Sequence, residues 1–270
     1  MENSQVLRTL IAARRRRIEE VRASTSLESL RQVAEARSER RDFAGAISGR
    51  LLSVIAELKR ASPSRGLLRP EYRPLEIAES YQQAGASALS VLTEEQFFQG
   101  SLSDLTAVRE AVRLPVLRKD FIVDEYQVYE SVAAGADALL LIVAALEDKD
   151  LKRFIELSER LHVAALVEVH TAEELERAAH AGARIIGINN RNLNTLEVSL
   201  EASFRLREKI PPSCLAVSES GIKSGNDVER LARAGFNAVL IGEHLMLADD
   251  PGKELSRLLK SAPTLKMAGA

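Results

Sequence analysis

The stretch Ala134-Gly-Ala-Asp-Ala-Leu-Leu-Leu141 is one of four similar copies along the chain. The other copies are Ala84-Gly-Ala-Ser-Ala-Leu-Ser-Val91, Ala181-Gly-Ala-Arg-Ile-Ile-Gly-Ile188 and Ala234-Gly-Phe-Asn-Ala-Val-Leu-Ile241, so successive copies begin 50, 47 and 53 residues apart. In each copy the glycine suits the left-handed cap of a helix, and the apolar run suits a buried strand. Each copy therefore predicts a helix that ends and leads directly into a strand.

Eight short apolar runs lie around these copies. They span residues 53–58, 87–92, 115–118, 137–142, 164–169, 184–189, 214–218 and 237–241. Continuous runs rich in leucine and β-branched residues are typical of parallel strands buried on both faces. The segments between the runs are long enough for helical crossovers. The four copies precede the second, fourth, sixth and eighth runs, so one period corresponds to two strand–helix units.

Two architectures are compatible with such a period. A repeat solenoid could show it, but the polar residues gather at the strand ends, which suits a closed eight-stranded barrel better. We therefore predict an α/β fold with a single (β/α)8 TIM barrel over residues 49–262 as the catalytic domain. Residues 1–48 are expected to form an N-terminal helical extension, because they contain no proline and carry apolar residues at helical spacing.

The extension contains the run Arg14-Arg15-Arg16-Arg17. Such a run could bind a phosphate backbone. The neighbouring acids Glu19 and Glu20 and the small net charge of the chain instead favour a solvated helix face.

Composition excludes several classes of protein. The chain has 270 residues, of which 46% are hydrophobic, and a net charge of −2, so no general attraction to nucleic acid is expected. Its one cysteine, Cys214, cannot form an internal disulfide and is compatible with a reducing compartment. No apolar run reaches the length of a transmembrane helix, and the N-terminus lacks the pattern of a signal peptide. We expect a cytoplasmic protein without a membrane or nucleic-acid partner; a monomer is compatible with the sequence, which leaves the oligomeric state open.

The first predicted strand carries two charges. It lies in the stretch Val54-Ile-Ala-Glu-Leu-Lys-Arg-Ala-Ser-Pro-Ser-Arg-Gly66, where Glu57 and Lys59 are two residues apart and so share one face. Charges in a short buried strand are costly unless they are paired or used. A structural ion pair and a functional pair are both open for this motif taken alone.

Similar polar residues follow most of the other predicted strands. They are Thr93 and Glu94; Arg118, Lys119 and Asp120; Glu168 and His170; Asn189, Asn190 and Arg191; Ser218, Glu219 and Ser220; and Glu243. A polar rim is normal on any face that bears loops, but ionisable and amide groups at so many strand ends favour an active site there. Ser220-Gly221 and Gly242-Glu243 follow the last two strands, where barrels of this type commonly bind phosphate through backbone N–H groups.

The sequence resembles the indole-3-glycerol-phosphate synthase family of tryptophan biosynthesis. The matching motifs are Ile55–Gly66, Ser90–Glu94 with Phe98–Ser101, Pro115–Ile122, Asp124–Gln127, Leu166–His170, Gly187–Leu193, Ser218–Ile222 and Leu240–Gly242. They occur in the family's order and cover residues 50 to 245. A departure is slight: Arg65 stands where lysine is common.

The resemblance implies a reaction and a set of residue roles. The family closes the indole ring of 1-(2-carboxyphenylamino)-1-deoxyribulose 5-phosphate, with loss of carbon dioxide and water. The resemblance points to Lys119 as the acid that polarises the ketone, provided the pKa of Lys119 is tuned toward neutrality. Glu168 is then the expected base, with Lys59 assisting hydroxyl departure and Glu57 orienting Lys59; the sequence leaves open which lysine serves which step.

The remaining expected site residues bind the substrate. Asn189, Glu219 and Ser220 are assigned to the sugar hydroxyls, Ser62 to general substrate binding, and Arg191 to the carboxylate. Phe98, Phe121 and Leu140 are assigned to a slot for the aromatic ring, and Gly221, Gly242 and Glu243 to the phosphate. The reaction requires no cofactor, and the four histidines are too isolated to suggest a metal site.

Two rival functions are disfavoured by particular residues. Another phosphate-binding barrel enzyme, such as phosphoribosylanthranilate isomerase, lacks the Glu-x-Lys-x-x-Ser-Pro-Ser motif that begins at Glu57. A barrel retained only for binding or regulation would be expected to lose Lys119 or Glu168, and both are present.

Overall fold

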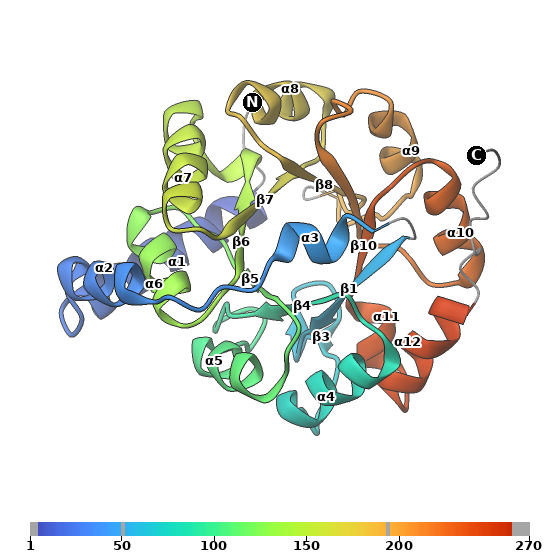
Figure 1. Ribbon diagram of the computed structural model, residues 1–270, viewed down its shortest axis with the longest axis horizontal. Helices are drawn as coiled ribbons and strands as arrows, with labels where there is room; N and C mark the ends of the chain where they lie inside the picture. Colours follow the sequence, from blue (N-terminus) through green and yellow to red (C-terminus); the bar gives the residue numbers. More distant parts are fainter. Residues whose placement is uncertain (1–4, 50–51, 193–194, 261–270) are drawn as a thin grey trace.

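The strands form one closed parallel barrel. A computed structural model describes residues 5–49, 52–192 and 195–260. The barrel strands are β1 (Ser53–Leu58), β4 (Ala88–Leu92), β5 (Val116–Lys119), β6 (Ala138–Ile142), β7 (Ala164–Val169), β8 (Ile185–Asn189), β9 (Leu215–Glu219) and β10 (Ala238–Ile241). Each pairs with its neighbours in chain order, and β10 closes onto β1 (Figure 1). The predicted (β/α)8 barrel is confirmed, and its expected end at residue 262 lies outside the described residues.

Helices surround the barrel on its outer side (Figure 1). They are α4 (Pro74–Ala84), α5 (Leu102–Ala111), α6 (Glu125–Ala133), α7 (Asp148–Arg160), α8 (Ala172–His180), α9 (Glu201–Arg207), α10 (Gly225–Arg233), α11 (Glu243–Leu247) and α12 (Pro251–Lys260), with a short 3₁₀ helix η1 (Val143–Ala145). The glycines of the four repeat copies have φ angles of 95°, 100°, 90° and 83°. The prediction that they terminate helices in the left-handed conformation is confirmed.

The strands alternate between two apolar cores. On β6, Ala138, Leu140 and Ile142 belong to the cluster inside the barrel. Leu139 and Leu141 belong to the larger cluster between the strands and the helices. This period of two is the reason that the strands appear continuously apolar in the sequence: both faces are buried.

The N-terminal extension spans the barrel from one end to the other. It consists of α1 (Gln5–Arg22), α2 (Leu27–Ala36) and α3 (Phe43–Ile47). In Figure 1, α3 lies in front of the barrel centre and α1 lies behind α6. Phe43 and Ile47 of α3, and Leu7 and Leu10 of α1, pack into the cluster inside the barrel. The extension therefore covers the N-terminal ends of the strands with α3 and reaches the opposite end with α1.

Arginines fix the extension to the ends of three outer helices. Arg37 donates to the carbonyl of Ala136 after α6 at 2.6 Å, Arg40 to that of Leu161 after α7 at 3.1 Å, and Arg41 to that of Arg109 in α5 at 2.9 Å. The last carbonyls of a helix lack intrahelical partners and carry partial negative charge. The segment after α2 thus satisfies carbonyls of three successive strand–helix units.

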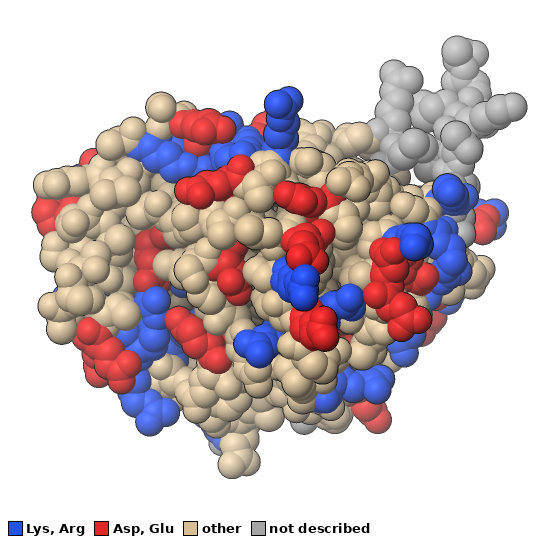
Figure 2. Space-filling view, turned by 90° about the horizontal axis from the view of Figure 1, so that it is seen from below, with Lys and Arg blue, Asp and Glu red and all other residues tan. Residues whose placement is uncertain are grey.

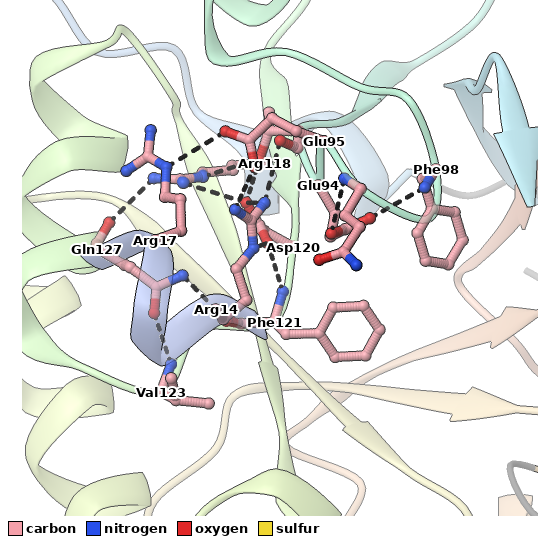
Figure 3. Close-up of polar contacts among 12 residues, drawn as sticks. Arg14, Arg17, Glu94, Glu95, Phe98, Arg118, Asp120, Phe121, Val123 and Gln127 are labelled. Atoms are coloured by element: carbon pink, nitrogen blue, oxygen red, sulfur yellow. Dashed lines mark hydrogen bonds and ion pairs between the residues drawn. The ribbon is translucent and has the colours of Figure 1, made fainter. Parts of the chain in front are cut away.

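The arginine run in α1 differs from the prediction. Arg15 and Arg16 are exposed, as a solvated helix face requires, but Arg14 is only 2% exposed and Arg17 is half-buried. Arg14 pairs with Asp120 and Glu95, and Arg17 also pairs with Glu95 (Figure 3). Arg17 forms a further pair with Glu130. The prediction of a solvated face is wrong for Arg14 and Arg17, because their carboxylate partners lie about eighty or more residues away in the sequence.

The outer surface is mixed in charge. On the face that Figure 2 shows, basic and acidic side chains are interspersed, and neither sign forms one large patch. Within the described part of the chain, no helix combines the length and apolar character needed to cross a lipid bilayer.

Candidate active site

A cavity of about 670 Å³ opens at the C-terminal ends of the strands. This volume falls within the usual range for small-molecule sites. Of the residues predicted for the site, the lining includes Glu57, Lys59, Phe98, Lys119, Phe121, Leu140, Glu168, Asn189, Arg191, Glu219, Ser220, Gly221, Gly242 and Glu243. Ser62 does not line this cavity; it is buried in strand β2 (Ala61–Ser62), which pairs with β3 (Gly66–Leu67) in the loop after β1. The barrel thus brings together residues from all parts of the sequence after residue 56.

Lys119 lies between two carboxylates at the centre of the site. Its ammonium donates to Oε2 of Glu168 at 2.9 Å and lies 3.3 Å from Oε2 of Glu219. The other oxygen of Glu168 accepts from the Asn189 amide at 3.1 Å. The three charged side chains end β5, β7 and β9, and alternation along each strand points them into the barrel.

Burial and charge set the protonation of this cluster. Burial alone would lower the pKa of Lys119, but the adjacent Glu168 and Glu219 carboxylates overcome it and raise that pKa. The pKa of Glu168 is lowered: burial opposes its charge, and Lys119 and His170 outweigh that burial. Burial and the charge of Glu168 raise the pKa of Glu219 to about 7, against the attraction of Lys119. The pKa of Lys119 therefore moves away from neutrality, opposite to the expected direction, because two carboxylates share one ammonium.

Glu57 and Lys59 form the second charged pair. Lys59 Nζ lies 2.7 Å from Glu57 Oε1, so the two charges on one face of β1 pair with each other. Both side chains also line the cavity. The structural and functional alternatives for this motif are therefore compatible, because the pair is formed and still faces the site.

Two glycines leave room for carboxylates that line the cavity. A Cβ on Gly187, in the middle of β8, would lie 2.1 Å from Oε1 of Glu219. A Cβ on Gly242, directly after β10, would lie 2.1 Å from Oε1 of Glu57. Any side chain at either position would displace the carboxylate. Gly187 was not predicted as a site residue, since a glycine inside a strand gives no sign of which side chain approaches it.

An apolar slot lies beside the charged cluster. The rings of Phe98 and Phe121 are 6.2 Å apart and tilted by 40° (Figure 3). Leu140 also lines the cavity. Glu94 holds the loop that carries Phe98, because its carboxylate accepts from the backbone N–H groups of Gln96, Phe97 and Phe98 at 3.0, 2.7 and 2.9 Å. The slot can accept a planar ring within reach of Lys119.

A buried ionic network supports the strand end behind Lys119. Arg14 of α1 contacts both oxygens of Asp120, at 2.6 and 2.8 Å, and Arg118 contacts the same carboxylate at 3.1 Å (Figure 3). Thr93 donates to Asp120 at 2.5 Å. Asp120 is adjacent to Lys119 in the chain, so this network fixes the backbone that carries the central ammonium.

Backbone turns and basic residues line the cavity near the loops after β1, β8 and β9. Ser220 and Gly221 have φ angles of 68° and 84°; a non-glycine residue at positive φ is strained and typical of functional sites. Arg191 and Arg65 lie 3.1 and 3.3 Å from the Glu243 carboxylate. Lys223, which the sequence analysis missed, also lines the cavity. This part of the cavity can receive an anion.

The fold and the site together define an acid–base barrel enzyme for a small substrate with an apolar ring and an anionic group. A family model described as indole-3-glycerol phosphate synthase matches residues 7–258. The chain belongs to the indole-3-glycerol phosphate synthase family.

Individual relatives agree with this assignment. The chain is 49% identical to the indole-3-glycerol phosphate synthase of Polaromonas naphthalenivorans (strain CJ2) over 259 residues, which cover 94% of this chain and 98% of the relative. It is 50% identical to that of Chloroherpeton thalassium (strain ATCC 35110 / GB-78) over 244 residues, covering 89% and 94%.

Solved structures with low sequence identity share the barrel. A 3-hexulose-6-phosphate synthase matches with a TM-score of 0.63 and 17% identity, covering 78% of this chain and 100% of that one. A thiamine phosphate pyrophosphorylase from Pyrococcus furiosus matches with a TM-score of 0.60 and 17% identity, covering 80% and 96%. At this identity the likeness shows the fold alone.

Proposed function

We propose that Lys119 and Glu168 carry out the proton transfers of indole-3-glycerol phosphate synthesis in this chain. The reaction is that of its family: ring closure, decarboxylation and dehydration of 1-(2-carboxyphenylamino)-1-deoxyribulose 5-phosphate. The observation that carries the proposal is the position of Lys119, whose ammonium lies between two carboxylates at the cavity floor.

The first step needs an acid at the ketone oxygen. The raised pKa of Lys119 keeps its ammonium protonated. The ammonium polarises the ketone, the aromatic carbon that bears the carboxylate attacks it, and a new carbon–carbon bond closes the ring. Loss of carbon dioxide then restores the aromatic system, and the former ketone oxygen remains as a hydroxyl group.

The dehydration needs a base and an acid. Glu168 is ionised, because its pKa is lowered by Lys119 and His170 against the effect of burial. It takes the ring proton, while an ammonium assists the departing hydroxyl; Lys59, held by Glu57, is the second candidate for that role. When Glu168 takes up a proton, Lys119 loses one neighbouring negative charge and the pKa of Lys119 falls. Glu168 and Lys119 therefore readily exchange protons.

The remaining lining residues hold the substrate. The aromatic ring occupies the slot of Phe98, Phe121 and Leu140, and Arg191 pairs with the ring carboxylate. Asn189, Glu219 and Ser220 face the sugar hydroxyls. The turn at Gly221 and the residues Gly242 and Glu243 border the phosphate, with Lys223 and Arg65 supplying positive charge beside Glu243.

The rest of the proposal concerns the chain as a whole. Residues 1–48 form the helical extension, and residues 49–262 form the catalytic barrel. The enzyme acts in the cytoplasm without a nucleic-acid partner, which the near-neutral net charge and the mixed surface in Figure 2 support. No cofactor is required by the chemistry, and the chain is expected to act as a monomer.

Glu168→Gln separates the steps of the reaction. Glutamine keeps the size and the hydrogen bond to Asn189 but cannot accept the ring proton. Ring closure and decarboxylation do not need this base, so we expect carbon dioxide from carboxyl-labelled substrate to appear faster than indole fluorescence in quenched-flow experiments. If both signals fall by the same factor, Glu168 acts earlier or only in binding.

A further inference from the structure

His170 lies beside the proposed base without a role so far. It follows β7, two residues after Glu168, and its side chain is 11% exposed. Nε2 lies 3.5 Å from Oε1 of Glu168, and Nδ1 lies 3.3 Å from Oε2 of Glu174 in the first turn of α8. The imidazole therefore lies between two carboxylates, one in the active site and one outside it.

The Glu174 carboxylate is itself held in place. It accepts the backbone N–H of His170 at 2.7 Å, and the N–H of Glu174 donates to Thr171 at 3.2 Å. Glu174 thus faces the imidazole from a capped helix end and favours a protonated ring. Within the described residues Nε2 has no hydrogen-bond partner, since 3.5 Å to Glu168 is a charge contact and not a well-formed hydrogen bond.

Charges around the ring are mainly negative. The ionisable groups that face it are Glu168 on its own strand, Glu174 on α8 and Glu219 on β9, with Lys119 of β5 on the far side of Glu168. Burial lowers the pKa of His170, but these carboxylates outweigh it and raise that pKa.

We propose that His170 is a positioning residue that, as an imidazolium held by Glu174, keeps Glu168 ionised and ready to act as the base. The positive charge lies on the side of Glu168 opposite Lys119, so the carboxylate keeps one cation beside it when Lys119 releases its proton. The proposal rests on the proposed role of Glu168 as the base, and it adds that His170 keeps the Glu168 carboxylate ionised.

The pH dependence of kcat tests the effect on catalysis. His170→Gln removes the positive charge, which raises the pKa of Glu168 and moves the acidic limb of the kcat profile to higher pH, by about half a unit or more. Glu174→Gln moves the limb in the same direction, because His170 loses the partner that keeps it protonated. His180→Gln, an exposed histidine of α8, is the matched control and leaves the limb in place. A uniform fall in kcat with an unmoved limb in His170→Gln would show a merely structural role and overturn the proposal.

NMR titration of the imidazoles tests the charge itself, independently of activity. The protein has four histidines, and the His170 signal is the one lost in His170→Gln. We expect His170 to titrate above the ordinary value of about 6.5 and to titrate lower in both Glu174→Gln and Glu168→Gln. Titration at or below the ordinary value would overturn the proposal even if Glu168 is the base. If His170 titrates as expected in every variant but Glu168→Gln still dehydrates the intermediate at the wild-type rate, Glu168 is not the base. That result would also refute the proposed purpose of the contact between His170 and Glu168.

Discussion

At Glu219, a buried carboxylate occupies a position that destabilises its ionised form. Its side chain is buried, and neither carboxylate oxygen accepts a well-formed hydrogen bond from a described residue. Only the Lys119 ammonium, 3.3 Å away, offsets the loss of water and the repulsion from Glu168. A free carboxylate facing a cavity is poorly stabilised until a substrate hydroxyl donates to it, which fits the proposed contact with the sugar.

Glu219→Gln should therefore stabilise the protein at alkaline pH. The pKa of Glu219 is raised to about 7, so the folded state holds this proton more tightly than the unfolded chain does. That advantage is complete below the unfolded value and is lost as pH rises through about 7. Glutamine mimics the neutral acid at every pH, so chemical unfolding should show a variant more stable than wild type by roughly 1–3 kcal/mol at pH 8 and near-equal stability at pH 5. An identical difference at the two pH values would show that Glu219 titrates normally.

Residue identities were predictable where the chemistry lies next to a strand. Glu57, Lys119, Glu168 and Glu219 were found because ionisable and amide groups at so many strand ends together favour an active site, although each one alone could be structural. Their protonation was not predictable, because it depends on the carboxylates of other strands. Arg14 was missed for the same reason: its partner Asp120 is 106 residues away.

At the scale of elements, α1 acts as a support for the active site. Arg14 makes two contacts with Asp120, which follows Lys119, and a contact with Glu95, which lies in the loop before Phe98 (Figure 3). One helix of the extension thus ties together the strand end that carries the proposed acid and the loop that carries the aromatic slot. The sequence predicted a helix here but could not predict where it packs, since the residues that receive it come from the barrel.

Removing Arg14 should cost far more than removing its neighbour. Arg14→Met leaves Asp120 buried with one cation fewer, and breaking a buried ion pair typically costs about 3–5 kcal/mol. Arg15→Met, in the exposed part of the same run, should change the free energy of unfolding by less than about 0.5 kcal/mol. Guanidinium unfolding of both variants measures the difference. Equal stability of the two would mean that α1 is not held by this pair.

At the scale of the whole molecule, the closed barrel creates the site. The eight strands pair in register so that Asn189 lies beside Glu219, and Glu168 lies between Ile142 and Gly187. Closure brings these strand ends, which lie far apart in the sequence, around one cavity. The repeat near 50 residues, together with the polar residues at the strand ends, predicted this architecture, because two strand–helix units form one period. The extension, which spans both ends of the barrel, lies outside the repeat and could be predicted only as helical.

The central claim is that the Lys119 ammonium is the acid that starts ring closure. Steady-state kinetics of Lys119→Met, followed by indole fluorescence, test it most directly, with circular dichroism to confirm folding and the exposed Lys152→Met as a control. General acid catalysis contributes about 10²–10⁴-fold, so kcat should fall by at least about 100-fold while KM changes only a few-fold. A folded Lys119→Met enzyme that keeps more than about a tenth of the wild-type kcat would contradict the claim, because so small a loss is less than a general acid supplies.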